Sequence, residues 1–231
     1  MTRADSPDTD RVKGRFEPIA DARPDDGPWP AMAWPPTVER LTGLVVELLP
    51  CVPHRDAAAL FDALDDDAVW RHIVGRPRDA EEFALTLAKR QAEGRFIWVV
   101  RLLRPHGMLA AGAVVGASSY LDVSVPDARI EIGATSYAPT VWASKVNPDT
   151  KRLLLEHAFE VLGAGRVQLK TDARNVRSQQ AIARLGARYE GTLRHHQRRS
   201  DGSLRDTVLF SILPTEWPAV RQGLLARIEG R

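Results

Sequence analysis

The sequence of 231 residues predicts an α+β fold, with a mostly antiparallel sheet of six or seven strands flanked by about four helices. Three observations lead to this prediction. Short runs with the period of a strand recur along the chain, and longer runs with helical spacing separate some of them. The composition, 44% hydrophobic and 27% charged, is typical of a globular protein with a sizeable core.

The first elements are one strand and two helices. Residues 42–49 form the first strand. Residues 53–64 begin with proline and place apolar side chains at helical spacing, which predicts a helix. Residues 78–92 repeat the helical pattern.

Three strands follow, over residues 95–103, 109–121 and 129–137. The second run is apolar on both faces, as expected of a strand in the centre of a sheet. Turn residues separate the three runs, so we expect a meander of consecutive antiparallel strands.

The second half alternates helices and strands. We expect helices over 148–162 and 175–185, strands over 166–171, 188–199 and 205–213, and a short tail helix opened by Pro214, Trp217 and Pro218. The pair Asp201-Gly202 predicts a tight hairpin between the last two strands.

The first 40 residues have a different character, because they hold seven of the 16 prolines and eight acids without any helical or strand period. We expect an extension over 1–40 and a single domain over 41–231. Trp29 and Trp34 would be unusual in a solvated tail, so part of the extension is expected to dock on the domain or on a partner.

Composition also excludes several classes of protein. The longest near-apolar run, 108–117, is half of the roughly 20 residues that a membrane-spanning helix needs, and the N-terminus lacks the apolar segment of a secretory signal. The single cysteine, Cys51, suits the cytoplasm and is expected to be a buried, inert thiol. A net charge of +2 argues against a dedicated nucleic-acid binder. His195 and His196 have no further ligand at suitable spacing, so no metal site is expected.

Residues 129–162 read as a strand, a short loop and a helix. This arrangement can hold a phosphate, because the first N–H groups of a helix lack internal partners. Lys145, Lys151 and Arg152 lie in or just after the loop. The alternative is a solvated helix start, which needs no ligand.

A second strand and helix meet in the sequence TDARNVRSQQAIARLGA. Asn175 is a candidate N-cap of this helix, and that role alone could explain it. Gly186 is a candidate for the glycine that follows a helix end.

The run from Glu131 to Ala187 resembles the RimJ/RimL-like branch of the GNAT acetyltransferase superfamily. The most specific matches are EIG, the VN-x-x-x-K loop and helix, and TDARN-x-x-S-x-x-A-I-x-x-LGA. The resemblance implies the GNAT fold, in which a twisted sheet splays open between the EIG and QLKT strands to bind acetyl-coenzyme A as co-substrate.

The resemblance also implies a set of residues at the coenzyme. Those on the first strand, in the phosphate loop and at the second helix are Gly133, Ala134, Thr135, Trp142, Ser144, Lys145, Val146, Asn147, Arg152, Asn175, Arg177 and Ser178. The loop departs from the family's Q/R-x-x-G-x-G/A pattern, because Trp142, Lys145 and Asn147 occupy its defining positions. Lys145 adds charge and narrows the conformational freedom of the loop.

Two residues are candidates for the chemistry. Glu131 on the EIG strand is the expected general base for the amine, and the alternative is a carboxylate in a surface ion pair. The resemblance implies that Ser178 gives its proton to the departing thiolate, and the alternative is a surface or capping serine. A backbone N–H near residues 133–136 would hold the thioester oxygen.

The predicted function is acetyl transfer from acetyl-coenzyme A to a primary amine, either a protein N-terminus or a small amine. The missing loop glycines leave open a non-catalytic module that binds acyl-coenzyme A. Asp65, Asp66 and Asp67 are candidates to meet the cationic amine. A monomer or a homodimer is expected.

Overall fold

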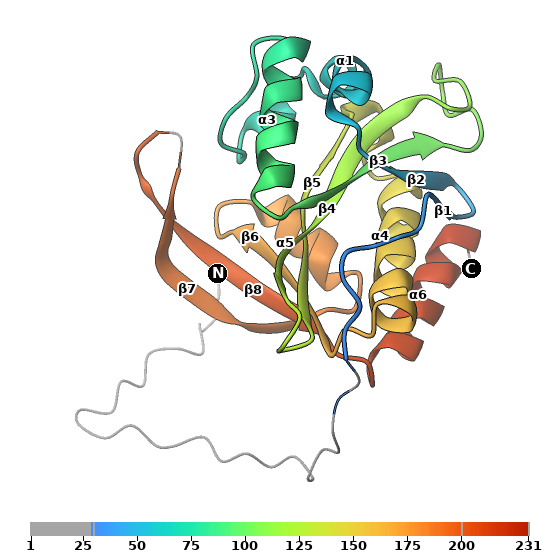
Figure 1. Ribbon diagram of the computed structural model, residues 1–231, viewed down its shortest axis with the longest axis vertical. Coiled ribbons are helices and arrows are strands. Elements are labelled where there is room, and N and C mark those ends of the chain that lie inside the picture. Colours follow the sequence, from blue (N-terminus) through green and yellow to red (C-terminus); the bar gives the residue numbers. More distant parts are fainter. Residues whose placement is uncertain (1–28, 30, 200, 231) are drawn as a thin grey trace, which may run out of the picture.

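The computed structural model describes residues 29, 31–199 and 201–230, which form one eight-stranded sheet with helices on both faces (Figure 1). The strands are β1 (Leu41–Thr42), β2 (Val46–Pro50), β3 (Phe96–Leu102), β4 (Val114–Ser124), β5 (Arg129–Tyr137), β6 (Arg166–Asp172), β7 (Arg188–Arg198) and β8 (Leu204–Ile212). The helices are α1 (Pro53–Leu64), α2 (Asp67–Trp70), α3 (Ala80–Ala92), α4 (Val146–Glu156), α5 (Val176–Ala183) and α6 (Trp217–Glu229).

The strand order is β1-β2-β3-β4-β5-β6-β8-β7. Every pair of neighbours is antiparallel except β5 and β6, which run parallel. The predicted meander is confirmed as β3-β4-β5, and the predicted hairpin around Asp201-Gly202 is confirmed as β7-β8. In Figure 1 this hairpin extends beyond the body of the domain.

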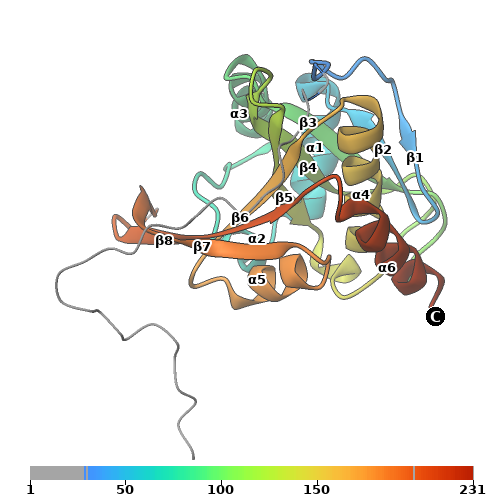
Figure 2. The same ribbon diagram turned by 90° about the horizontal axis from the view of Figure 1, so that it is seen from below.

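Two apolar layers sandwich the sheet, because side chains alternate between its faces. Trp98 and Val100 of β3 belong to the core under α4, α5 and α6. Ile97 and Val99 of the same strand belong to a second cluster under α1 and α3. Figure 2 shows the strands between these groups of helices.

The helix predictions agree closely with the structure. The helix predicted over 53–64 has the same bounds as α1, and α3, α4, α5 and α6 lie within two or three residues of their expected starts. The helix predicted over 148–162 ends differently, because the segment after α4, His157–Val161, is π-helical. The four-residue helix α2 was not predicted.

The strand count is eight rather than six or seven, because the run predicted as one strand over 42–49 turns at its start. Asp149, in the first turn of α4, accepts hydrogen bonds from the N–H groups of Leu44, Val45 and Val46 at 2.7, 2.7 and 3.1 Å. A Cβ atom on Gly43 would lie 2.2 Å from Asp149 Oδ2. A carboxylate more than 100 residues away therefore shapes the β1–β2 turn.

The strand β4 begins at Val114, five residues after its predicted start. Residues 109–113 turn back on β3 instead: the N–H of Gly112, at a φ of +81°, donates to Leu102 O. Gly112 tolerates this left-handed conformation at no steric cost.

The described part of the extension packs on the domain. Met32 is 4% exposed and belongs to the main core. The ring of Trp34 meets Phe96 and Tyr120 edge-on, at centroid distances of 6.2 and 6.3 Å. Trp29 donates through Nε1 to a carbonyl in the turn after the π-helical segment. Most of the proline-rich extension, residues 1–28, lies outside the described residues.

Cys51 is buried, as predicted, and burial raises the pKa of its thiol to about 12, which keeps it protonated and unreactive. Within residues 29, 31–199 and 201–230, none of the helices is long and apolar enough to cross a membrane. In the same residues, His, Cys, Asp and Glu side chains form no group of three that could hold a metal ion.

Candidate functional site

The strands β5 and β6 part shortly after they begin. They pair in parallel only from Arg129 with Arg166 to Glu131 with Gln168, although β5 runs on to Tyr137. Beyond these pairs, no β5–β6 pairing occurs among the described residues, while β4 and β8 still pair with the outer edges. The inner edges therefore offer backbone N–H and C=O groups to a ligand that can act as a partial strand.

A β-bulge interrupts β5 beside this gap. The register moves from Ser119 opposite Gly133 to Ala117 opposite Ser136, so that Ala134 and Thr135 together face Ser118. Ala134 has a φ of +46°, in the left-handed region that favours glycine. Gly133, Ala134 and Thr135 thus lie on the stretch of β5 beyond its pairing with β6, and the bulge re-aims their backbone.

The loop before α4 lies at the end of β5. Ser144 donates through Oγ to Val141 O at 2.6 Å and accepts from the N–H of Val146 at 3.2 Å. Its hydroxyl thereby orders the start of α4. Lys145 stands at the N-cap position with its side chain exposed, so its charge adds to the positive end of the helix dipole.

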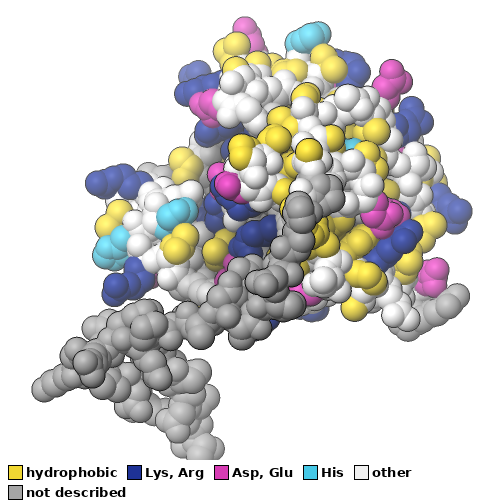
Figure 3. Space-filling view, turned by 60° about the horizontal axis from the view of Figure 1, so that its bottom comes forward, with side chains coloured by type: hydrophobic (Ala, Val, Ile, Leu, Met, Phe, Trp, Pro, Cys, Tyr) yellow, Lys and Arg dark blue, Asp and Glu magenta, His cyan; other side chains and the backbone are white. Residues whose placement is uncertain are grey.

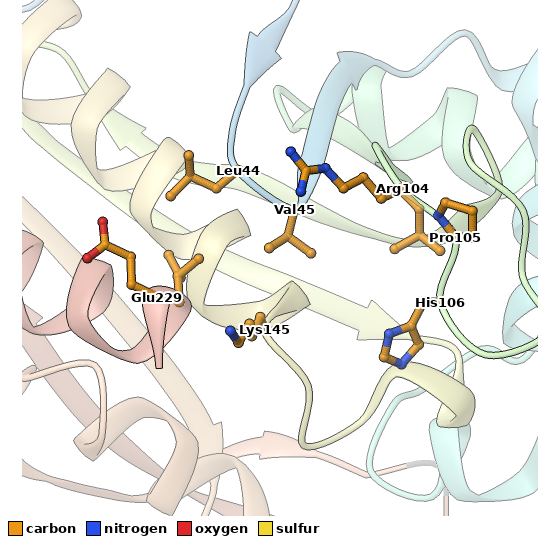
Figure 4. A pocket seen from close by; sticks show the side chains of 9 residues that line it. Leu44, Val45, Arg104, Pro105, His106, Lys145 and Glu229 are labelled. Atoms are coloured by element: carbon orange, nitrogen blue, oxygen red, sulfur yellow. The ribbon is translucent and has the colours of Figure 1, made fainter. Parts of the chain in front are cut away.

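Lys145 also borders a cavity of about 340 Å³, which Leu44, Val45 and Glu229 line as well (Figure 4). Arg104 and His106, from the turn between β3 and β4, lie across the cavity from it. The loop between β5 and α4 therefore has cationic and titratable side chains around it, although it lacks the glycines of the family pattern.

Arg152 has partners that the sequence did not indicate. Its guanidinium bonds to Asp149 Oδ1 at 2.9 and 3.1 Å and to Glu156 Oε2 at 2.7 Å, and its side chain is only 9% exposed. The structure brings Val146 and Asn147 to the start of α4 but turns Arg152 toward the β1–β2 turn. Arg152 therefore supports the helix rather than facing the loop.

The start of α5 faces the same gap from β6. Asn175 is the N-cap, as predicted: its Oδ1 accepts from the N–H of Ser178 at 3.0 Å. The guanidinium of Arg177 lies 3.6 Å from the centroid of the Trp142 ring, a cation–π contact. This contact joins the loop after β5 to the helix after β6, so Trp142 and Arg177 lie together at one end of the gap. Ser178 lies in the first turn of the same helix, where its N–H donates to Asn175.

Glu131 lies at the opposite end of the gap, where the strands part. The residue is 6% exposed, and its carboxylate lies 2.7 Å from Lys170 Nζ and 3.4 Å from Gln168 Nε2. The carboxylate does form an ion pair, but a buried one rather than the surface pair considered from the sequence. A Cβ atom on Gly133 would lie 2.8 Å from Glu131 Oε1, so glycine makes room for this side chain.

Several cations surround Glu131 on the face under α1 and α3. Burial lowers the pKa of Arg95 at the start of β3, and Glu131 opposes that shift. Burial also lowers the pKa of Arg205 on β8, where Asp172 and Glu131 act in the other direction. Figure 3 shows Lys and Arg side chains between the β7–β8 hairpin and the body of the domain. The surroundings of Glu131 therefore contain Lys170, Arg95 and Arg205, together with the carboxylate of Asp122, which lies 3.3 Å from Lys170 Nζ.

The sequence reasoning missed Gln168, Lys170, Arg95 and Arg205. Strand alternation could have indicated the first two: Glu131 pairs with Gln168, and Lys170 lies two residues further on the same face of β6. Arg95 directly precedes β3 and Arg205 lies on β8, and only the sheet order brings these strands near Glu131.

The acids Asp65 to Asp67 are engaged locally. Arg76 pairs with Asp65 and Asp67, and Asp66 caps α2 by accepting from the N–H of Ala68 at 2.8 Å. Their partners are thus within the segment that connects α1 to α3.

One buried lysine has an unusual environment. Lys151 on α4 is 5% exposed, and its Nζ lies 2.6 Å from Thr135 Oγ1 and 3.2 Å from Ser118 Oγ. Burial lowers its pKa to about 7, and the charge of Glu131 opposes the shift only in part. Its ammonium is solvated by two hydroxyls, and none of the ion pairs among the described residues includes it.

This environment predicts a pH-dependent stability. Between about pH 7 and 10.5 the unfolded chain binds a proton at Lys151 that the folded chain has lost, so folding becomes more favourable as the pH rises. Below about pH 7 the full cost of the buried charge remains. The free energy of unfolding of the wild type, relative to Lys151→Met, should therefore rise between pH 7 and 9.5 by on the order of 1 kcal/mol per pH unit.

Urea unfolding of both proteins across this pH range measures the difference, in which the other titrating groups cancel. Lys89 of α3 is exposed, so Lys89→Met should follow the wild type at every pH. Parallel curves for the wild type and Lys151→Met would contradict the prediction.

Comparison with known proteins adds to this geometry. The family model described as "Acetyltransferase (GNAT) domain" matches residues 46–188. A protein from T. thermophilus classed with the acetyltransferases is 37% identical, with a TM-score of 0.73 over 85% of this chain and 98% of that one. A GCN5-related N-acetyltransferase from Brucella melitensis is 26% identical, with a TM-score of 0.78 over 87% and 89%.

A third solved structure shares the fold at lower identity. It is the RimJ protein of Mycobacterium smegmatis in complex with CoA-disulfide, 23% identical, with a TM-score of 0.68 over 84% of this chain and 95% of that one. A search of curated proteins finds no match.

Proposed function

Because the chain belongs to the GNAT acetyltransferase family, we propose that it moves an acetyl group from acetyl-coenzyme A to a primary amine, on a protein N-terminus or a small molecule. We further propose that it belongs to the RimJ/RimL-like branch. The observation that carries the proposal is the gap between β5 and β6, with a helix N-terminus at one end and a buried carboxylate at the other.

The residues around the gap fit an acyl-coenzyme A. The inner edge of β5 at Gly133, Ala134 and Thr135 can pair with the amide groups of a pantetheine arm, as a neighbouring strand would. The amide NH₂ of Asn175 can donate to the same arm from the other side. At the end of β5, the N–H groups of residues 144–147 suit a pyrophosphate. Lys145 would contribute its backbone N–H, because its side chain borders the cavity beside α6.

The stacked pair of Trp142 and Arg177 lies where both loops meet. In the proposal the guanidinium of Arg177 faces a phosphate and the indole limits how far the loops separate. Arg152 acts indirectly, since its bonds to Asp149 and Glu156 fix the first turns of α4.

When bound, acetyl-coenzyme A supplies an acetyl thioester, whose C–S bond is exchanged for a C–N bond to the amine with release of the free thiol. Glu131 accepts the proton that the amine nitrogen loses, directly or through a water. The hydroxyl of Ser178 protonates the departing sulfur and regains a proton from solvent. Backbone N–H groups of residues 133–136 stabilise the negative charge on the carbonyl oxygen.

The cations around Glu131 also help the acceptor. An amine that binds beside Lys170, Arg95 and Arg205 is disfavoured in its protonated form, because like charges lower its pKa. The nucleophile must be neutral, so this environment favours the reactive form of the amine.

The proposal is tested with the full chain. Isothermal titration calorimetry with acetyl-coenzyme A and a thiol-release assay with a library of peptides and small amines should show binding and turnover. A protein that binds acetyl-coenzyme A but releases no thiol with any acceptor would instead be the non-catalytic module. A protein that does neither would refute both functions.

A further inference from the structure

The buried ammonium of Lys151 joins three elements at one point. It reaches from α4 to Thr135 on β5 and to Ser118 on β4, and the two hydroxyls lie 2.7 Å from each other. These hydroxyls come from the two sides of the β-bulge, since Ala134 and Thr135 together face Ser118. Lys151 therefore holds the two strands of the bulge together from the face of the sheet that α4 covers.

The place of the bulge is specific. The last β5–β6 pair is Glu131 with Gln168, and the bulge follows within three residues, on the stretch of β5 that has lost its inner neighbour. The left-handed backbone of Ala134 is sterically unfavourable for a residue with a Cβ atom, and such a conformation persists only where surrounding contacts impose it. The three side chains Lys151, Ser118 and Thr135 supply those contacts.

Filling space does not explain the lysine. A methionine or leucine would occupy the same region of α4 without the cost of desolvating a charge, which here lowers the pKa of Lys151 to about 7. What a lysine adds is directed N–H donors that reach two hydroxyls on different strands. These two hydrogen bonds restrain the backbone of β5 relative to β4 at the bulge.

We propose that Lys151, acting through Ser118 and Thr135, holds the β5 bulge so that the N–H groups of residues 133–136 point at the thioester carbonyl. Lys151 is then a positioning residue, which touches neither coenzyme nor acceptor. The inference rests on the proposed function, because it assigns a role within that reaction. Lys151 also connects the bulge to the phosphate loop, since it lies on α4 and that loop leads directly into α4.

The test compares Lys151→Met and Thr135→Val with the wild type and with Lys89→Met, which removes the same charge from an exposed position on α3. We expect kcat to fall about 100-fold in both test variants, as for a misaimed oxyanion donor, with acetyl-coenzyme A affinity within about threefold of the wild type. The double variant should be no slower than the slower single variant, because the two residues act as a unit.

Infrared spectroscopy distinguishes a loss of the hydrogen bonds to the thioester carbonyl from a general loss of structure. In the infrared spectrum of bound acetyl-coenzyme A labelled with ¹³C at the carbonyl, hydrogen bonding lowers the stretching frequency. The shift should be present in the wild type and in Lys89→Met, and reduced in Lys151→Met and Thr135→Val. Circular dichroism and unfolding curves confirm that each variant is folded.

Three results would overturn the inference: an unchanged kcat in folded Lys151→Met, a loss of coenzyme affinity in place of a loss of kcat, or additive effects in the double variant. If Lys151→Met does not fold, the same criteria apply to Thr135→Val. A wild type without turnover would refute the proposed function, and this inference with it, whereas an active wild type with an equally active Lys151→Met would refute the inference alone.

Discussion

Replacing Glu131 by glutamine is expected to lower kcat/KM for the amine by about 100-fold or more, because the amide cannot accept the proton that the amine loses. The amide keeps the size of the side chain under Gly133, so the fold and the gap should be retained. Acetyl-coenzyme A affinity, measured by calorimetry, should stay within about threefold of the wild type.

Two controls separate catalysis from the ion pair. Glu81 on α3 is exposed, so Glu81→Gln should leave kcat/KM unchanged. Thermal unfolding of Glu131→Gln reports what the pair with Lys170 contributes to stability. A variant that loses stability but keeps kcat/KM within threefold of the wild type would show that Glu131 serves the ion pair and not proton transfer.

Replacing Asp149 by alanine is expected to destabilise the protein by about 3–5 kcal/mol. The side chain is fully buried, and its loss strands three backbone N–H groups and leaves the guanidinium of Arg152 without one partner. Urea unfolding followed by circular dichroism measures the loss. Asp62→Ala, on the exposed side of α1, should change the unfolding midpoint little.

A substitution at Gly43 tests the same hydrogen bonds between Asp149 and the β1–β2 turn. Gly43→Ala places a Cβ atom against the Asp149 carboxylate and should destabilise by itself. In the variant that carries both Gly43→Ala and Asp149→Ala, the carboxylate that clashes with the new Cβ atom is absent. The loss in free energy of unfolding should therefore be smaller than the sum of the two single losses. Additive losses would show that the two residues do not act on one contact.

Local patterns were enough to predict most elements. The helix α1 has its predicted bounds because proline opens it and apolar residues keep one spacing to its end. Asn175 is the cap it was expected to be, since capping depends on residues three apart. The β1–β2 turn was not predicted, because the carboxylate of Asp149 that shapes it is remote in the sequence.

In the candidate site, too, the features set by neighbouring residues could be predicted and those set by remote residues could not. The gap between β5 and β6 was expected only through the family resemblance, because no periodicity indicates where two strands part. Lys151 was noted for its place after the loop, but its burial against Ser118 and Thr135 depends on how α4 packs across the sheet. Arg95 and Arg205 meet Glu131 through the sheet order, which the pattern of single strands does not contain.

The docked segment before β1 determines how the protein can be divided. The family match begins at residue 46, yet Met32 is part of the main core and Trp34 packs against it. At the other end the match stops at residue 188, whereas Phe210 and Trp217 are core residues too. The structural unit is therefore larger than the matched region. Cutting at the limits of the match would remove core residues, and a fragment that keeps all of the described core spans at least residues 32–228.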